Sequence, residues 1–256
     1  MVGRCGFDPR LGSDGWRHGD APVHMKVGVN MSIKARLVCV TNQDELDRAL
    51  EAAPDDEVAI EIRSDPGKYV PNYLFVADSR GHYIEARGES RVVVSNTAEI
   101  VATDHSQIEA HDESIVAAIG AAQVNWRDHS TGSCGHYARG QVWDEATVST
   151  HSEYPLLAFD DATVTVEGVA HVVARERVSV TARDHAVVEM SGDVDVTAQD
   201  QVVIHCEGGE VYARDHVTVY VARFADRPDV EGTPTVVVHD IKGDTPVTGG
   251  AVVVAG

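Results

Sequence analysis

An eight-residue pattern of apolar and polar positions runs through the chain from Tyr83 to Glu210. The second position of the block is Ile, Val or Leu in fourteen of the sixteen blocks, and Gly132 and Gly140 are the exceptions. The fourth position is Ala in eight blocks and small or apolar in most of the others. Because side chains alternate along a strand, both positions point to the same side. Each block therefore predicts a short strand with one buried face.

The sixth position of the block is Gly, Asp or Asn in thirteen of the sixteen blocks. These residue types tolerate left-handed or turn backbone geometry, so we expect a corner after every strand. One block cannot bury its apolar face alone. Two facing blocks form a flat coil of sixteen residues, and stacked coils close a continuous core.

A second repeat, of sixteen residues, favours this two-sided coil over a three-sided coil of twenty-four residues. Outward-facing pairs such as Thr163 with Thr165 and Ser179 with Thr181 recur every sixteen residues, and the intervening blocks lack them. We therefore predict an all-β fold, a narrow two-sided β-solenoid with about 16 residues per coil. The frame slips by one residue at Gly208–Gly209, where we expect a β-bulge.

Residues 1–34 have no periodic pattern and are predicted to be a flexible leader. Met1, Met25 and Met31 are alternative translation starts within it. The leader lacks the apolar stretch of a secretory signal, and no apolar run approaches the roughly 20 residues that span a bilayer. We therefore expect a soluble protein that is cytoplasmic or virion-associated.

Residues 35–72 predict a small α/β cap at the N-terminal end of the solenoid. Thr41 and Asn42 offer an N-cap for a helix over Glu45–Ala52, and Val58–Ile62 alternates as a strand does. A cap of this kind covers the unpaired strand edges of an open solenoid end, which otherwise favour aggregation.

The solenoid itself is predicted to cover residues 73–226, and residues 227–256 are expected to form C-terminal strands or a tail. Two Val-rich segments in this last part, Thr235–His239 and Ala251–Ala255, predict short strands. We expect them to form a terminal hairpin or tail, joined to the last repeat by a polar connector that contains Pro and Gly.

Overall charge narrows the choice of partner. The formal net charge is −20, which repels nucleic acid phosphates and anionic membrane surfaces. We expect a protein partner or self-association, and neither direct nucleic acid binding nor membrane binding. The cysteines are widely scattered and are predicted to be unpaired buried thiols: Cys5, Cys39, Cys134 and Cys206.

Two segments resemble known families. The segment VTNQDELDRALEAAPDDEVAIEI is similar to the strand and helix that open many right-handed β-helix proteins of the pectate-lyase-like type. Blocks such as SVTARDHA resemble the octapeptide-repeat β-solenoid proteins of actinobacteria and their phages, and more distantly the repeats of ice-nucleation proteins. The resemblance covers roughly residues 36–225 and implies a solenoid and a phage-related context. It implies no single activity, because solenoids host many activities.

An acidic column is predicted on one corner of the rod, on five successive coils. It consists of Asp112, Asp128, Asp144, Asp160 and Glu176. Two interpretations stay open. Calcium accepts such oxygen ligands and is the one cofactor that the column suggests. Alternatively, each carboxylate bonds the backbone of its own corner and points into water. A shorter column on the opposite corner, Asp184, Asp200 and Asp215, has the same two interpretations.

An Asp-His pair recurs along the chain, but the sixteen-residue register separates the histidines. His105 and His185 share a corner five coils apart, and His129 lies on the other corner. No three of these histidines converge on one ion, as a catalytic metal site requires. The remaining metal candidate is the group of Cys134, His136 and His151.

One face of the solenoid carries hydroxyl side chains at regular spacing. They are Thr147, Thr163, Thr165, Ser179, Thr181 and Thr197. Such a face is a candidate for binding ice or another ordered surface, or it reflects the strand preference of Thr. About four Thr/Ser rungs and no tyrosine ladder are present, unlike the longer ladders of ice-nucleation repeats.

The sequence predicts no catalytic residues, since no Ser/His/Asp arrangement or phosphate-binding glycine loop can be placed on neighbouring coils. We expect a non-enzymatic, rigid structural or binding module that presents a flat, repetitive acidic surface to a protein partner or to itself. Three alternatives stay open: an acidic nucleic-acid mimic that inhibits a DNA-binding protein, an ice- or surface-binding protein, and a polysaccharide-acting β-helix enzyme. The enzyme is disfavoured because eight-residue blocks leave no room for the long loops that wall a cleft.

Overall fold

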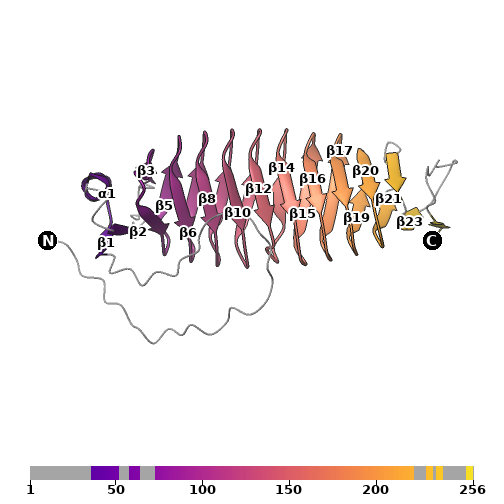
Figure 1. Ribbon diagram of the computed structural model, residues 1–256, viewed down its shortest axis with the longest axis horizontal. Coiled ribbons are helices and arrows are strands. Elements are labelled where there is room, and N and C mark those ends of the chain that lie inside the picture. The colour runs from indigo at the N-terminus through magenta and orange to yellow at the C-terminus, as the bar shows by residue number, and fades with distance from the viewer. Residues whose placement is uncertain are drawn as a thin grey trace, which may run out of the picture.

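The computed structural model describes residues 36–51, 58–63, 73–221, 229–232, 235–238 and 252–255. The predicted leader and the alternative translation starts lie outside these residues. The described strands form two parallel sheets of 12 strands each, which run the length of an elongated rod (Figure 1). The prediction of an all-β, two-sided solenoid is confirmed.

The two sheets, here called sheet A and sheet B, alternate along the chain. Sheet A contains, in spatial order, β1 (Arg36–Val40), β2 (Val58–Ile62), β4 (Tyr83–Ala86), β6 (Glu99–Ala102), β8 (Ile115–Ala118), β10 (Thr131–Cys134), β12 (Thr147–Thr150), β14 (Thr163–Val166), β16 (Ser179–Ala182), β18 (Asp195–Ala198), β20 (Glu210–Ala213) and β22 (Asp229–Gly232). Sheet B contains β3 (Tyr73–Val76), β5 (Arg91–Val94), β7 (Gln107–Ala110), β9 (Gln123–Trp126), β11 (Arg139–Val142), β13 (Leu156–Ala158), β15 (His171–Glu176), β17 (Val187–Gly192), β19 (Val203–Cys206), β21 (Thr218–Val221), β23 (Thr235–Val238) and β24 (Val252–Ala255).

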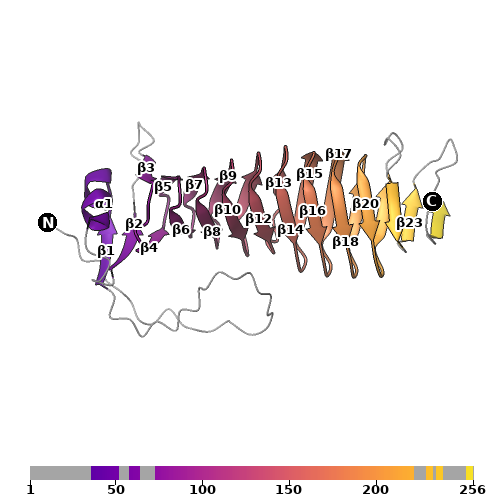
Figure 2. The ribbon, with the colours of Figure 1, turned by 45° about the horizontal axis from the view of Figure 1, so that its top comes forward.

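Strands of one sheet pair in a register of sixteen residues through the middle of the rod. Thr147 lies beside Thr163, and Thr163 lies beside Ser179. Each coil therefore gives one strand to each sheet, and Figure 2 shows the two sheets running side by side along the rod. The second and fourth positions of the blocks face each other between the sheets and are buried as predicted, except that Gly132 and Gly140 are only partly buried.

A third inward column, the eighth position of the block, was not predicted. Residues there, such as Ala98, Ala146 and Ala162, have no exposed surface. They stand at the end of a corner, just before the next strand, and most of them are small or medium in size; Tyr154, at the atypical corner of Ser152, is an exposed exception. In the N-terminal part of the rod the column contains serines, all fully buried: Ser90, Ser106, Ser114 and Ser130.

The corners have the left-handed backbone that the sixth position predicted. The angle φ is positive at that position in fifteen of the sixteen blocks, for example 55° at Asp104 and 65° at Gly120. His136 and Glu176 adopt it as well, with φ of 51° and 69°. Ser152 is the exception.

The corner at Ser152 differs because Pro155 occupies the first position of the next block. Elsewhere this residue donates its N–H to a carbonyl one coil back, as Arg139 does to Ala122 O at 2.9 Å. Proline has no N–H to donate. The hydroxyl of Ser152 lies 2.7 Å from Ala138 O, the carbonyl that would otherwise lose its partner.

The two glycine exceptions at the second position have the same two causes, the Trp126 indole and a backbone carbonyl of the preceding coil. The indole of Trp126 is fully buried at a position that is mostly small elsewhere. A Cβ added at Gly132 would collide with the backbone oxygen Val116 O and with Trp126 Nε1, and one at Gly140 would collide with Trp126 Cζ3 and with Val124 O. Both glycines therefore allow a close backbone approach between coils and make room for one oversized interior side chain.

The frame slip at Gly208–Gly209 is a shortened coil, so the predicted bulge is wrong. Asp195 of β18 pairs with Glu210 of β20, fifteen residues later. A bulge would add a residue, whereas this corner has one fewer. The shorter path brings the backbone so close to Val194 O that a Cβ at Gly209 would overlap it, and φ at Gly209 is 90°.

The predicted N-terminal cap is confirmed, with small shifts in its bounds. Helix α1 (Gln43–Leu50) begins two residues before the expected start, and its N-cap Asn42 accepts a hydrogen bond from Glu45 N at 3.0 Å. The carboxylate of Glu45 accepts in return from Thr41 N at 2.8 Å, which completes a capping box. That bond is the main cause of the lowered pKa of Glu45. Leu46 and Leu50 are buried under the helix.

The C-terminal strands extend the solenoid and do not form a hairpin. β22 pairs with β20, and β23 pairs with β21, so each continues its sheet. β24 pairs with β23 in parallel, with Thr235 beside Val252. A hairpin requires antiparallel strands, so that alternative is wrong.

The cysteines agree only in part with the prediction of free thiols. Cys134 and Cys206 are free and buried. Cys39 is disulfide-bonded, which corrects the prediction for that residue. Cys5 lies outside the described residues. Among the helices that the structure describes, none has the length and apolar character needed to cross a membrane.

Candidate functional site

The predicted acidic column follows the corner between each sheet B strand and the next sheet A strand. We call it the acidic edge, defined as Asp112, Asp128, Asp144, Asp160 and Glu176. Each of these residues has a left-handed backbone, with φ between 56° and 69°. Because they occupy one position of successive coils, they lie about one strand spacing apart, or about 4.8 Å.

Carboxylates of the acidic edge join neighbouring coils through backbone hydrogen bonds. Asp128 Oδ2 accepts from Asp112 N at 3.3 Å, and Asp144 Oδ2 accepts from Asp128 N at 3.3 Å. Glu176 Oε2 accepts from Asp160 N at 3.2 Å. The expected bond to the residue's own corner is therefore corrected: the acceptor carboxylate belongs to the next coil. The carboxylate accepts a hydrogen bond from a corner N–H that takes no part in the strand ladder.

The shorter column on the opposite corner uses the same bond. Asp184 Oδ2 accepts from Gly168 N at 3.0 Å, and Asp200 Oδ2 lies 3.5 Å from Asp184 N. Asp104, which the prediction left out of this column, accepts from Gly88 N at 3.2 Å. At stacked left-handed corners on either side of the rod, an acidic side chain thus accepts a hydrogen bond from the backbone of the preceding coil.

Basic side chains lie at intervals along the acidic edge. His111 Nδ1 lies 3.2 Å from Asp128 Oδ2. Arg177 donates two hydrogen bonds of 2.7 Å to the carboxylate of Asp161, and these bonds lower the pKa of Asp161. Between these points the edge presents exposed carboxylates.

The metal candidates from the sequence are not gathered into a cluster. In the part of the chain that the structure describes, no three His, Cys, Asp or Glu side chains are grouped to hold a metal ion. Cys134 points into the core, and burial raises the pKa of its thiol to about 12. The ring centroids of His136 and His151 lie 6.0 Å apart, and both residues are exposed. The pKa of His151 is lowered, first by partial burial of its ring and then by the charge of His136. Calcium binding by the acidic edge stays a prediction.

The hydroxyl face lies on the outside of sheet A and is in register. Thr165 lies beside Thr181, and Thr181 lies beside Thr197. At the first position of the block, Thr147, Thr163 and Ser179 lie beside one another in the same way. Every one of these side chains is at least partly exposed.

The hydroxyl face is one coil longer than the sequence analysis proposed. Thr131 lies beside Thr147, and Ser133 lies beside Ser149. These two residues occupy the same block positions as the later pairs. The signal was present but was obscured by Gly132, which interrupts the apolar pattern between them.

The corners that flank the strands of sheet B carry aromatic ladders that sequence reasoning missed. Trp143 and Phe159 are sixteen residues apart and stack with ring centroids 4.1 Å apart, and the guanidinium of Arg127 lies 5.5 Å from the Trp143 ring. The guanidinium of Arg139 lies 4.0 Å from the ring of Tyr154. Their ring faces contact side chains of neighbouring coils, so these ladders stabilise the stacking. A shared fifth block position was the signal that could have identified Trp143 and Phe159.

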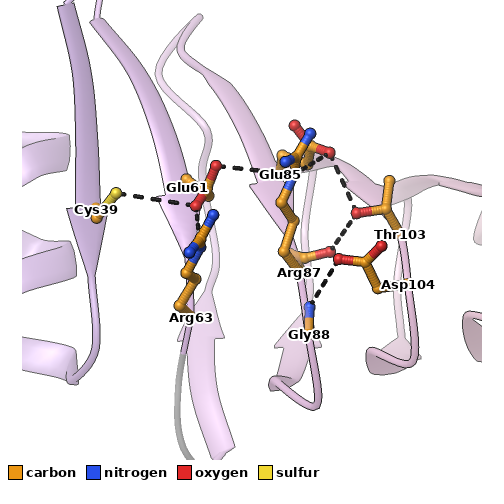
Figure 3. A network of polar contacts seen from close by, with 9 residues as sticks. Cys39, Glu61, Arg63, Glu85, Arg87, Gly88, Thr103 and Asp104 are labelled. Carbon is orange, nitrogen blue, oxygen red and sulfur yellow. Dashed lines mark hydrogen bonds and ion pairs between the residues drawn. The ribbon is translucent and has the colours of Figure 1, made fainter. Parts of the chain in front are cut away.

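A polar network joins the N-terminal cap to the first coils (Figure 3). Glu61 of β2 is only 4% exposed although it lies on the outside of sheet A, and it forms an ion pair with Arg63. Arg87 Nε lies 3.7 Å from Glu61 and 2.7 Å from Glu85, and Thr103 donates to Glu85 at 3.1 Å. The network spans β2, β4 and the corner after β6, so it supports the junction of cap and solenoid.

Comparison of the chain with protein-family models, with curated proteins and with solved structures found no match. The resemblance to octapeptide-repeat and right-handed β-helix proteins therefore stays a prediction. The solenoid fold by itself does not decide function, because the same architecture serves many functions.

Proposed function

We propose that this chain is a non-enzymatic, rigid binding module that presents its acidic edge to a protein partner or to other copies of itself. The observation that carries the proposal is the bond that four of the five edge carboxylates accept from the N–H of the preceding coil, such as Asp128 from Asp112 N at 3.3 Å. That bond holds the charges at fixed intervals along the rod. A regular, pre-organised row of charge suits a basic surface of similar length, because little side-chain freedom is lost on binding.

The test neutralises the edge without removing its hydrogen bonds. In the double variant Asp128→Asn, Asp144→Asn, the amide oxygens still accept from the corner N–H groups while two charges are lost. The matched control, Asp184→Asn with Asp200→Asn, makes the same change on the opposite corner. Partners are captured from the native host, identified, and titrated in purified form against all three proteins.

We expect the edge variant to bind its purified partner about tenfold more weakly, which corresponds to about 1.4 kcal/mol, and the control to bind as the original chain does. Equal loss in both variants, or loss in neither, contradicts a role of the acidic edge. A partner that binds DNA, is displaced by duplex DNA and dissociates steeply between low and physiological salt supports nucleic-acid mimicry instead.

A second candidate function is binding of ice or another ordered surface by the hydroxyl face. The favouring observation is the in-register stacking of Thr165 on Thr181 and Thr181 on Thr197, which fixes hydroxyl groups on a two-dimensional grid. The test is thermal hysteresis and ice-crystal shaping at micromolar protein. We expect both to disappear when Thr165 and Thr181 are replaced by bulky residues, and an original chain without either effect rules this function out.

A further inference from the structure

Strand β3 is the N-terminal edge of sheet B, and one backbone edge of this strand faces away from β5. Helix α1 lies at the same end of the rod (Figure 2). The side chain of Gln43, the first residue of α1, contacts that free edge of β3. Edge strands of this kind can accept a strand from another chain unless something covers them.

The amide of Gln43 makes the bonds that a neighbouring strand would make. Phe75 N donates to Gln43 Oε1 at 2.8 Å, and Gln43 Nε2 donates to Phe75 O at 3.0 Å. The N–H and C=O of one strand residue form such a pair of bonds with the peptide groups of an adjacent strand. Gln43 Nε2 also donates to Asp47 at 2.8 Å, which holds the amide in place. A peptide-like group thus already occupies one rung of this edge.

The next rung of this edge, at Tyr73, has no backbone partner among the residues that the structure describes. Along a strand the backbone groups of successive residues point to opposite edges, so Tyr73 faces the same edge as Phe75 and Leu74 faces β5. A hollow of about 360 Å³ adjoins Tyr73. It is lined by Thr41, Asn42, Gln43, Asp44, Tyr73 and Leu74. Because Gln43 and Tyr73 both line the hollow, it adjoins the rung next to the one that Gln43 occupies.

We infer that this edge binds an extended, basic segment of a partner protein, which adds as a strand beside β3. Tyr73 supplies the backbone donor and acceptor for it. Asp44 is the charged residue in the lining of the hollow and suits a Lys or Arg of the segment. Phe75, 59% exposed on the outer face, suits an apolar side chain beside it. A second copy fits less well, because each chain has a net charge of −20.

This inference rests on the proposed protein-binding function and adds a second contact point, at the end of the rod. The probe is a fluorescein-labelled hexapeptide of alternating Lys and Val, titrated against the full chain by fluorescence anisotropy. The comparison peptide has the same side chains with every backbone nitrogen methylated, so it cannot donate ladder hydrogen bonds. We expect the first peptide to bind and the methylated one to bind at least about tenfold more weakly.

Three variants locate the peptide. Gln43→Ala frees a second rung, so affinity should rise about tenfold. Tyr73→Pro removes one edge-facing N–H at the first residue of an edge strand, where proline is tolerated, and should weaken binding about fivefold or more. Tyr73→Phe keeps the backbone and the ring and should change nothing. Circular dichroism and thermal melting check that the cap is intact in each variant.

Equal binding of the methylated peptide, or equal affinity of Tyr73→Pro and Tyr73→Phe, overturns the inference. Peptide binding that survives Tyr73→Pro but is lost in Asp128→Asn, Asp144→Asn places the peptide on the acidic edge; the inference then fails and the proposed function stands. Concentration-dependent dimers of Gln43→Ala in sedimentation, without peptide binding, make a second copy the occupant and also overturn the inference.

Discussion

Two buried serines, Ser106 and Ser152, show what a single hydroxyl group does in the interior of this solenoid. The hydroxyl of Ser106 is fully buried and has no hydrogen-bond partner within the described residues. The equivalent position holds Ala in many other coils, such as Ala122. The hydroxyl of Ser152 instead lies 2.7 Å from Ala138 O, a carbonyl that lacks its usual ladder donor.

The two serines should therefore respond in opposite directions to the same substitution. Ser106→Ala removes an unsatisfied polar group, so the free energy of unfolding should rise by about 1 kcal/mol. Ser152→Ala leaves Ala138 O without a donor and should lower the free energy of unfolding by about 1–3 kcal/mol. Urea unfolding followed by circular dichroism measures both. Destabilisation by Ser106→Ala would mean that its hydroxyl has an acceptor.

Strands β9, β10 and β11 show how elements from successive coils adjust to one another. Trp126 of β9 fills the interior, and its Nε1 has no hydrogen-bond partner among the described residues. Gly132 of β10 and Gly140 of β11 lack the side chains that would collide with the indole. The departures from the block pattern are therefore coupled across three strands.

This coupling predicts a non-additive pair of substitutions. Gly132→Val alone overpacks the interior and should destabilise the chain by about 3 kcal/mol. Combined with Trp126→Ala, which restores the commonest residue of the fourth position, it should cost less, with a coupling energy of about 1–3 kcal/mol. A double-mutant cycle by urea unfolding measures this energy. Additive effects would show that the close approach of Val116 O, and not the indole, requires the glycine.

At the scale of the whole molecule, the rod has a slim apolar interior and two acidic corners. With a net charge of −20, its carboxylates repel one another, and the stacked coils hold the edge charges about 4.8 Å apart. Corner hydrogen bonds such as Asp144 to Asp128 N keep these charges in place. The same stacking that stabilises the core therefore concentrates charge at the surface.

We accordingly expect the melting temperature to rise from low to physiological ionic strength, because salt screens the repulsion along the edge. At constant ionic strength, millimolar calcium and a chelator should give the same melting temperature if the carboxylates only cap the corners. A midpoint that rises with calcium alone would instead reveal a bound ion. A midpoint that falls with added salt would contradict the repulsion argument.

The amino-acid sequence by itself determined the repeat, the two-sided coil, the cap and the columns on corners and faces. It could do so because strand alternation and corner geometry act over a few residues, and the period of sixteen then places residues such as Asp128 and Asp144 in one column. The choice of Asp, Gly or Asn at the corners likewise follows from backbone geometry that is local.

Only the tertiary structure decided which groups meet across coils. The bond from Asp128 to the preceding coil, the space for Trp126 and the contact of Gln43 with Phe75 all join residues that stacking brings together from different parts of the chain. The shortened coil at Gly208–Gly209 could be read from the sequence, because the next block begins at Glu210, seven residues after Val203, and a bulge would have moved it the other way. How this shorter corner closes, with the Gly209 backbone against Val194 O, depends on the stacking of the coils and is seen only in the tertiary structure.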